Sequence, residues 1–188
     1  MEPIRAVQWS PAGDALRIID QRRLPDACVE RELRTVEEVM EAIRTLAVRG
    51  APAIGVAAAI GLVASLLPFR DEDSLLVRAR LQAHAGLIGG TRPTAVNLSW
   101  AMQRMQDVAA ARPVATSAEL LDILRREATA ILDEDIAMCR AIGTRGATLI
   151  PDGTRILTHC NAGALATAGI GTALAPCLLY TSPSPRDS

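Results

Sequence analysis

Apolar residues recur at helical spacing along most of the first 150 residues. The capping box of Thr35 and Glu38 predicts a helix that starts there and ends near Val48. A second capping box, Thr116 with Glu119, predicts a long helix that ends by Gly143 or Gly146. Further helices are predicted at about 52–67, 74–88 and 94–111.

Strand-like runs occupy both ends of the chain. The runs 4–9 and 16–20 flank the turn cluster Ser10-Pro11-Ala12-Gly13-Asp14, which predicts a β-hairpin, and 28–33 is a candidate third edge strand. After the turn at 151–153, the run 154–159 predicts a strand. A short connector, Cys160-Asn161-Ala162-Gly163, then leads into a predicted helix at 164–173.

These elements predict an α/β protein with a domain boundary near residue 150. Residues 1–150 form a mainly helical N-terminal domain with a small antiparallel sheet. Residues 151–176 supply the first strand, loop and helix of a Rossmann-like domain. We expect that domain to be truncated, because one such unit is not a complete sheet.

The last segment, 177–188, departs from the rest of the sequence. It contains the only tyrosine, Tyr180, and a Ser-Pro-Ser-Pro run that cannot continue a helix. It resembles one translated reading frame of a sequencing-library adapter. We therefore expect 177–188 to be adapter-derived and foreign to the natural protein; a natural Ser/Pro tail is the alternative.

Composition narrows the function classes. Hydrophobic residues make up 49%, which is ample for a core, and all 20 basic residues are arginine, which excludes lysine-based Schiff-base chemistry. The net charge of −1 and 2% aromatic content give no reason to expect a nucleic-acid partner. The longest apolar run, 51–67, is interpreted as a buried helix, so no membrane partner is expected. The cysteine spacing fits neither disulfides nor a metal site, which favours the cytoplasm.

Cys160 is the strongest candidate for chemistry. It lies where the predicted strand ends and the next helix begins, the usual ligand edge of an open α/β sheet. Helix N-terminal amides there favour a thiolate, and a buried inert thiol is the alternative. His159 is adjacent, but neighbouring strand residues point to opposite faces, so a direct pair is not expected. Cys28 and Cys139 are interpreted as structural, and His84 as a solvated surface residue.

Arg49 and Arg92 form a second candidate site, one that could bind an anion. Each lies in a glycine-containing loop directly before a predicted helix. An arginine fork beside free backbone amides can bind a phosphate or another anion. Either arginine alone is as readily explained by a surface ion pair.

Three stretches together carry a family resemblance: 48–55 (Val-Arg-Gly-Ala-Pro-Ala-Ile-Gly), 91–98 (Thr-Arg-Pro-Thr-Ala-Val-Asn-Leu) and 158–167 (Thr-His-Cys-Asn-Ala-Gly-Ala-Leu-Ala-Thr). The chain resembles the S-methyl-5-thioribose-1-phosphate isomerases over residues 1–176. This family belongs to the superfamily of the alpha, beta and delta subunits of initiation factor 2B. The resemblance implies a homodimeric enzyme of methionine salvage that turns 5-methylthioribose 1-phosphate into 5-methylthioribulose 1-phosphate without a metal or cofactor.

The resemblance also assigns residues. It implies that Cys160 is catalytic and that Arg49, Gly50, Ala51 and Arg92 contact the sugar phosphate. The family's catalytic aspartate, glutamine contact and Asn-Lys pair have no counterpart in this chain, so we expect it to be inactive alone. Two alternatives stay open. One is a sister isomerase for ribose 1,5-bisphosphate or 5-deoxyribose 1-phosphate, and the other is a non-catalytic subunit of the initiation-factor type.

Overall fold

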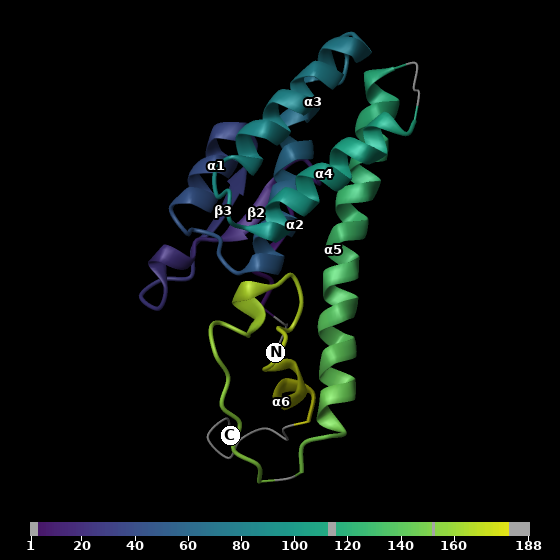
Figure 1. Cartoon of the computed structure of the whole chain (residues 1–188). Helices are drawn as coiled ribbons and strands as arrows, with labels where there is room; N and C mark the ends of the chain where they lie inside the picture. The colour runs from purple at the N-terminus through teal and green to yellow at the C-terminus, as the bar shows by residue number, and fades with distance from the viewer. Residues whose placement is uncertain (1–3, 113–115, 152, 181–188) are drawn as a thin grey trace.

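A computed structural model describes residues 4–112, 116–151 and 153–180 (Figure 1). In this part of the chain a helical body packs against a small sheet, and a long helix extends beyond that body (Figure 1). The helices are α1 (Val36–Arg44), α2 (Ala51–Leu66), α3 (Ser74–Gly89), α4 (Val96–Ala110), α5 (Ser117–Ala147) and α6 (Ala175–Tyr180). Short 3₁₀ turns are η1 (Gln21–Arg23), η2 (Leu67–Phe69) and η3 (Ala164–Ala166).

The sheet confirms the predicted hairpin and its edge strand. The strands β1 (Val7–Trp9), β2 (Leu16–Ile19) and β3 (Glu30–Leu33) pair antiparallel in that order. The β1–β2 turn closes because Ser10 Oγ accepts hydrogen bonds from the backbone N–H groups of Asp14 (3.1 Å) and Ala15 (3.0 Å). The short polar side chain thus substitutes for backbone partners, which explains why a serine opens this turn.

Helix α1 starts as predicted and ends early. Thr35 Oγ1 accepts from the Glu38 N–H, and the Glu38 carboxylate accepts from the Thr35 N–H, so the capping box is complete. The helix stops at Arg44 rather than near Val48. Leu46 adopts a left-handed backbone with φ 62°, which no α-helix can continue through.

Helix α2 is the core of the molecule. From Ala53 to Leu66 every residue is buried, which confirms the interpretation of this run as an interior helix. At Gly61 a Cβ would stand 2.6 Å from Val39 Cγ2, so the missing side chain lets α1 pack closely. By length and composition alone, residues Ala51–Phe69 could cross a membrane, but 78% of that window is buried inside the protein, as in a core helix.

Helix α5 extends from the helical body to the C-terminal segments. Thr116 and Glu119 form the second predicted capping box, and the helix continues to Ala147. Its last turns contact α6, and a Cβ at Gly146 would lie 2.6 Å from Pro176 Cγ. Figure 1 shows α6 and the yellow-green segment around η3 beside the lower half of α5.

The predicted strand–loop–helix unit is not formed. Residues 154–159 have no strand assignment, and the predicted helix at 164–173 reduces to the single turn η3. A parallel strand is stable only when neighbouring strands accept and donate its hydrogen bonds, and within the described residues none lies beside 154–159. The Rossmann-like interpretation is therefore not confirmed. Of the segment 177–188, residues 177–180 belong to α6, and residues 181–188 lie outside the described part.

Candidate functional site

Arg49 and Gly50 end the loop that joins α1 to α2, and Ala51 is the first residue of α2. Gly50 has φ 97°, a conformation that favours glycine, and α2 begins at the next residue with Pro52 in its first turn. No side chain caps this helix start among the described residues. Pro52 has no N–H group, and Ala53 is buried, so the exposed Ala51 supplies the first-turn N–H group that an anion can reach.

Gln21, which no sequence signal singled out, anchors this loop. Its Oε1 accepts a hydrogen bond from Arg49 Nε at 3.2 Å, and its Nε2 donates to the Leu165 carbonyl at 2.7 Å. Its backbone N–H donates to the Ala47 carbonyl at 2.9 Å. Gln21 is only 4% exposed. One buried amide thus joins the Arg49 loop to the segment that follows Cys160.

Gly50 touches the same segment directly. A Cβ on Gly50 would stand 2.5 Å from Ala166 Cα and 2.6 Å from the Ala166 carbonyl oxygen. Those atoms are backbone and cannot move aside as a flexible side chain would. The absence of a side chain at Gly50 therefore allows the loop and η3 to touch.

Helix α5 holds the other side of this segment. Asp135 Oδ2 accepts a hydrogen bond from the Ala168 N–H at 2.6 Å, and burial raises the pKa of the Asp135 carboxyl. Gly169 lies on Cys139, whose Cβ would be 2.9 Å from an added Cβ. Burial also raises the pKa of the Cys139 thiol, in agreement with the structural role predicted for it. Residues 165–169 are thus fixed between η1, the start of α2 and α5.

Cys160 lies five residues before Leu165 and is exposed. Its backbone is left-handed, with φ 65°, which is uncommon for a residue with a side chain. The predicted strand end and helix start are wrong here: the unpaired 154–159 stretch precedes Cys160, and η3 is too short to supply a helix dipole. Asn161 Oδ1 accepts from the Gly163 N–H at 3.2 Å and shapes the connector. His159 is exposed, and its carbonyl accepts a hydrogen bond from the Thr158 hydroxyl at 3.4 Å.

Arg92 lies half-buried in the loop between α3 and α4. The Ala95 N–H donates to its carbonyl at 2.9 Å, and α4 starts at Val96, later than predicted. The first turn of α4 packs on α2, since a Cβ at Gly55 would lie 3.1 Å from the Asn97 carbonyl oxygen. The loops of Arg92 and Arg49 therefore lie at the same end of this helix pair. Among the described residues, no hydrogen bond or ion pair joins Arg49, Arg92 and Cys160 to one another.

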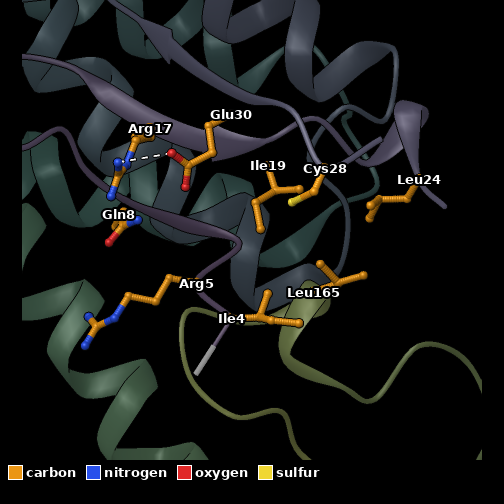
Figure 2. Close-up of a pocket in the computed structure, with 9 residues that line it drawn as sticks. All are labelled: Ile4, Arg5, Gln8, Arg17, Ile19, Leu24, Cys28, Glu30 and Leu165. Atoms are coloured by element: carbon orange, nitrogen blue, oxygen red, sulfur yellow. Dashed lines mark hydrogen bonds and ion pairs between the residues drawn. The ribbon is translucent and has the colours of Figure 1, made fainter. Parts of the chain in front are cut away.

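Two hollows flank the site. A cavity of about 530 Å³ lies between the sheet and Leu165, and the Arg17–Glu30 ion pair (3.1 Å) forms part of its wall. Figure 2 shows the residues that line it. Cys28 lines this cavity and is exposed. A second cavity of about 460 Å³ lies between α2, α4 and α5, and Asp135 contributes to its wall. Among the described residues, no cluster of three His, Cys, Asp or Glu side chains could hold a metal.

Comparison with known proteins agrees with this architecture. Residues 47–176 match the model of the initiation factor 2 subunit family. The methylthioribose-1-phosphate isomerase of Gemmatimonas aurantiaca is 57% identical over 92% of this chain and 49% of its own length. The 5-deoxyribose 1-phosphate isomerase of Moorella thermoacetica is 49% identical over 96% of this chain and 50% of its own length. The chain thus spans about half the length of the curated relatives it matches.

Two solved structures share the fold. The 5-methylthioribose 1-phosphate isomerase of Pyrococcus horikoshii superposes with a TM-score of 0.85 at 36% identity, over 93% of this chain and 48% of that one. The translation initiation factor eIF-2B subunit delta of A. fulgidus has a TM-score of 0.83 at 37% identity, over 93% and 50%. The helical body, its small sheet and the matched residues therefore identify the chain as a member of the initiation factor 2 subunit family.

Proposed function

We propose that this chain carries the phosphate-binding loops and the catalytic cysteine of an aldose–ketose isomerase that converts 5-methylthioribose 1-phosphate into 5-methylthioribulose 1-phosphate. The observation that carries the proposal is the contact of the Arg49 loop with the segment after Cys160, through Gln21 and Gly50. The names of the Gemmatimonas and Pyrococcus proteins support it. A cytoplasmic location, a sugar-phosphate ligand and a homodimer belong to the same proposal.

Arg49 is suited to hold the substrate phosphate. Its Nε–H is committed to Gln21, and its two terminal nitrogens make no hydrogen bond among the described residues. They can form a bidentate pair with phosphate oxygens. The uncapped start of α2 and the guanidinium of Arg92 add further positive potential at the same end of the helices.

The chemistry requires an acid–base group near C1 and C2 of the sugar. The C1 phosphate prevents spontaneous opening of the ring, so the C1–O4 bond breaks only with a proton supplied to O4. The C2 hydrogen then arrives at C1, as a proton through an enediol-type intermediate or as a hydride, while the C2 hydroxyl loses its proton and becomes the ketone. No external oxidant is consumed on either route. Cys160 is the acid–base residue that this chain contributes.

Two other functions have specific support. The name of the Moorella relative supports 5-deoxyribose 1-phosphate as the substrate. This sugar differs from the first substrate only in lacking the methylthio group at C5. The A. fulgidus structure favours a subunit of an initiation factor. An exposed Cys160 thiol, five residues before the segment that contacts the Arg49 loop, supports an enzyme over a subunit, because a binding subunit has no need of an acid–base group.

The test uses a completed polypeptide, in which residues 1–176 of this chain continue into the C-terminal half of the Gemmatimonas relative. Ketose formation is followed by NMR with 5-methylthioribose 1-phosphate, 5-deoxyribose 1-phosphate and ribose 1,5-bisphosphate. The proposal predicts the highest kcat/KM for the first, and no turnover for the Cys160→Ala variant. A higher value for either other sugar would assign that substrate instead. Absence of turnover with all three would favour the subunit.

A further inference from the structure

Gln21 makes a connection that few side chains could replace. Arg49 Nε–H can only donate a hydrogen bond, and the Leu165 carbonyl can only accept one. The side chain between them must present one acceptor and one donor a few ångströms apart. A primary amide does so, and these two partners fix which way the amide of Gln21 faces.

The near-complete burial of Gln21 makes both bonds matter. A buried polar atom that loses its hydrogen-bond partner is left desolvated and unpaired, which costs free energy. Both hydrogen bonds of the buried Gln21 amide are therefore strongly favoured over a state in which they are broken. The third bond, from the Gln21 N–H to the Ala47 carbonyl, ties the backbone of Gln21 to the approach to Arg49. The amide therefore has little freedom to move independently of either loop.

The two loops held by Gln21 carry different parts of the proposed reaction. Arg49 presents its terminal nitrogens to the phosphate, and Leu165 belongs to the segment that continues from Cys160. A rotation of the Gln21 amide would release both at once. Figure 2 shows the Leu165 side chain in the wall of the sheet-side cavity. The carbonyl of the same residue accepts the hydrogen bond from Gln21 Nε2.

We propose that Gln21 is a positioning residue: it orients Arg49 for the substrate phosphate and fixes the Arg49 loop to the segment that follows Cys160. The role rests on the function proposed above. It acts through Arg49 and Leu165, without contact between Gln21 and the substrate.

The first test measures the connection in the whole chain by amide hydrogen exchange and by NMR of the Arg49 Nε–H. Gln21→Leu should raise exchange in residues 165–168 and at Arg49 Nε–H about tenfold. Gln21→Glu keeps the acceptor for Arg49 but loses the donor for Leu165, so only the 165–168 segment should loosen. The control is Ser65→Ala, which removes the hydrogen bond between the buried Ser65 hydroxyl and His84 at the opposite end of α2. It should leave both signals unchanged.

The second test asks whether the connection positions Arg49. In the completed polypeptide, Gln21→Leu should raise KM about tenfold with kcat within about threefold, because phosphate contact is shared by ground and transition states. In an Arg49→Ala background the same change should add no further rise in KM. A purely structural role would instead give independent, additive effects.

The outcomes separate the two proposals. Wild-type exchange in Gln21→Leu, or an additive KM effect in the Arg49→Ala background, would overturn the role of Gln21 while the isomerase activity stands. A completed polypeptide that turns over no sugar phosphate would overturn the proposed function and the positioning role with it. Increased exchange together with the non-additive KM effect would establish both.

Discussion

Gly50 and Ala166 are in backbone contact, although 116 residues separate them. Gly50 has a left-handed φ of 97°, and an added Cβ would overlap the Ala166 backbone at 2.5 Å. Two independent constraints, conformation and space, therefore exclude a side chain at Gly50. The contact joins the start of α2 to the turn η3, and Gln21 hydrogen-bonds to residues on both sides of it.

Gly50→Ala should destabilise the chain by about 2–4 kcal/mol, since a positive φ and an overpacked contact each cost about 1–3 kcal/mol. Urea unfolding measures this. Gly86→Ala is the matched control. Gly86 lies within α3 on its exposed face, and no atom lies within 4 Å of an added Cβ. That change should stabilise by about 0.5–1 kcal/mol. Equal effects at the two glycines would contradict the Gly50–Ala166 contact.

His84 should make the stability of the chain depend on pH. Contrary to the interpretation as a solvated residue, it is half-buried, and its Nδ1 lies 2.9 Å from Oγ of Ser65. Burial lowers its pKa below the ordinary 6.5, the nearby Arg80 lowers it further, and Glu37 opposes the shift. The unfolded chain therefore binds the proton more readily than the folded one, so the unfolding free energy should fall as the pH drops below about 6.5.

The two histidines of the chain supply the test and its control. His84→Gln should flatten the dependence of unfolding free energy on pH between about 7 and 5. His159→Gln is the matched control, because His159 is exposed whereas His84 is half-buried beside Ser65. Urea unfolding at several pH values measures both. A slope that persists in His84→Gln would assign the dependence to other groups.

The sequence predicted the elements whose signals are local. Helices α1 and α5 each start at a capping box, at Thr35 and Thr116, and continue with apolar residues at a 3.6-residue spacing. Both signals lie within a short stretch of sequence. The strand at 154–159 was wrong because a parallel strand depends on partners elsewhere in the sequence. Its failure also removed the helix that was to follow Cys160, and with it the dipole argument for the thiol.

The site residues divide in the same way. Gly50 was identified because its loop has a local pattern, whereas Gln21 acts through residues 28 and 144 positions away and has no local signature. A signal did exist for Asp135: it lies four residues after Ile131 and four before Cys139, both buried, which places it on the inner face of α5. The same helical spacing predicts that His84 is at least partly buried, because it lies three residues after Leu81 and four before Ile88, both buried.

Arg49 and Arg92 should act on substrate affinity. In the completed polypeptide, Arg49→Ala or Arg92→Ala should raise KM about 10- to 100-fold, the worth of one or two charge-assisted hydrogen bonds, with a smaller change in kcat. Arg44→Ala is the control, since Arg44 is exposed in the last turn of α1 and outside both loops. Calorimetry with the sugar phosphate checks the binding directly. Normal substrate affinity in both loop variants would show that the phosphate does not bind at this end of the helices.

Cys160→Ala should abolish turnover in the completed polypeptide without unfolding it. Loss of an acid–base residue typically lowers kcat by about 10²–10⁴-fold, whereas replacement of an exposed side chain changes stability by less than about 0.5 kcal/mol. Cys28→Ala is the matched control, because Cys28 is also exposed but lines the cavity beside the sheet.

Thiol labelling of the folded chain identifies each site: Cys28 and Cys160 should react quickly, and Cys139 slowly because burial raises its pKa. A Cys160→Ala variant with near-normal kcat would remove the thiol from the reaction, and a large loss in Cys28→Ala would move the chemistry to the sheet-side cavity.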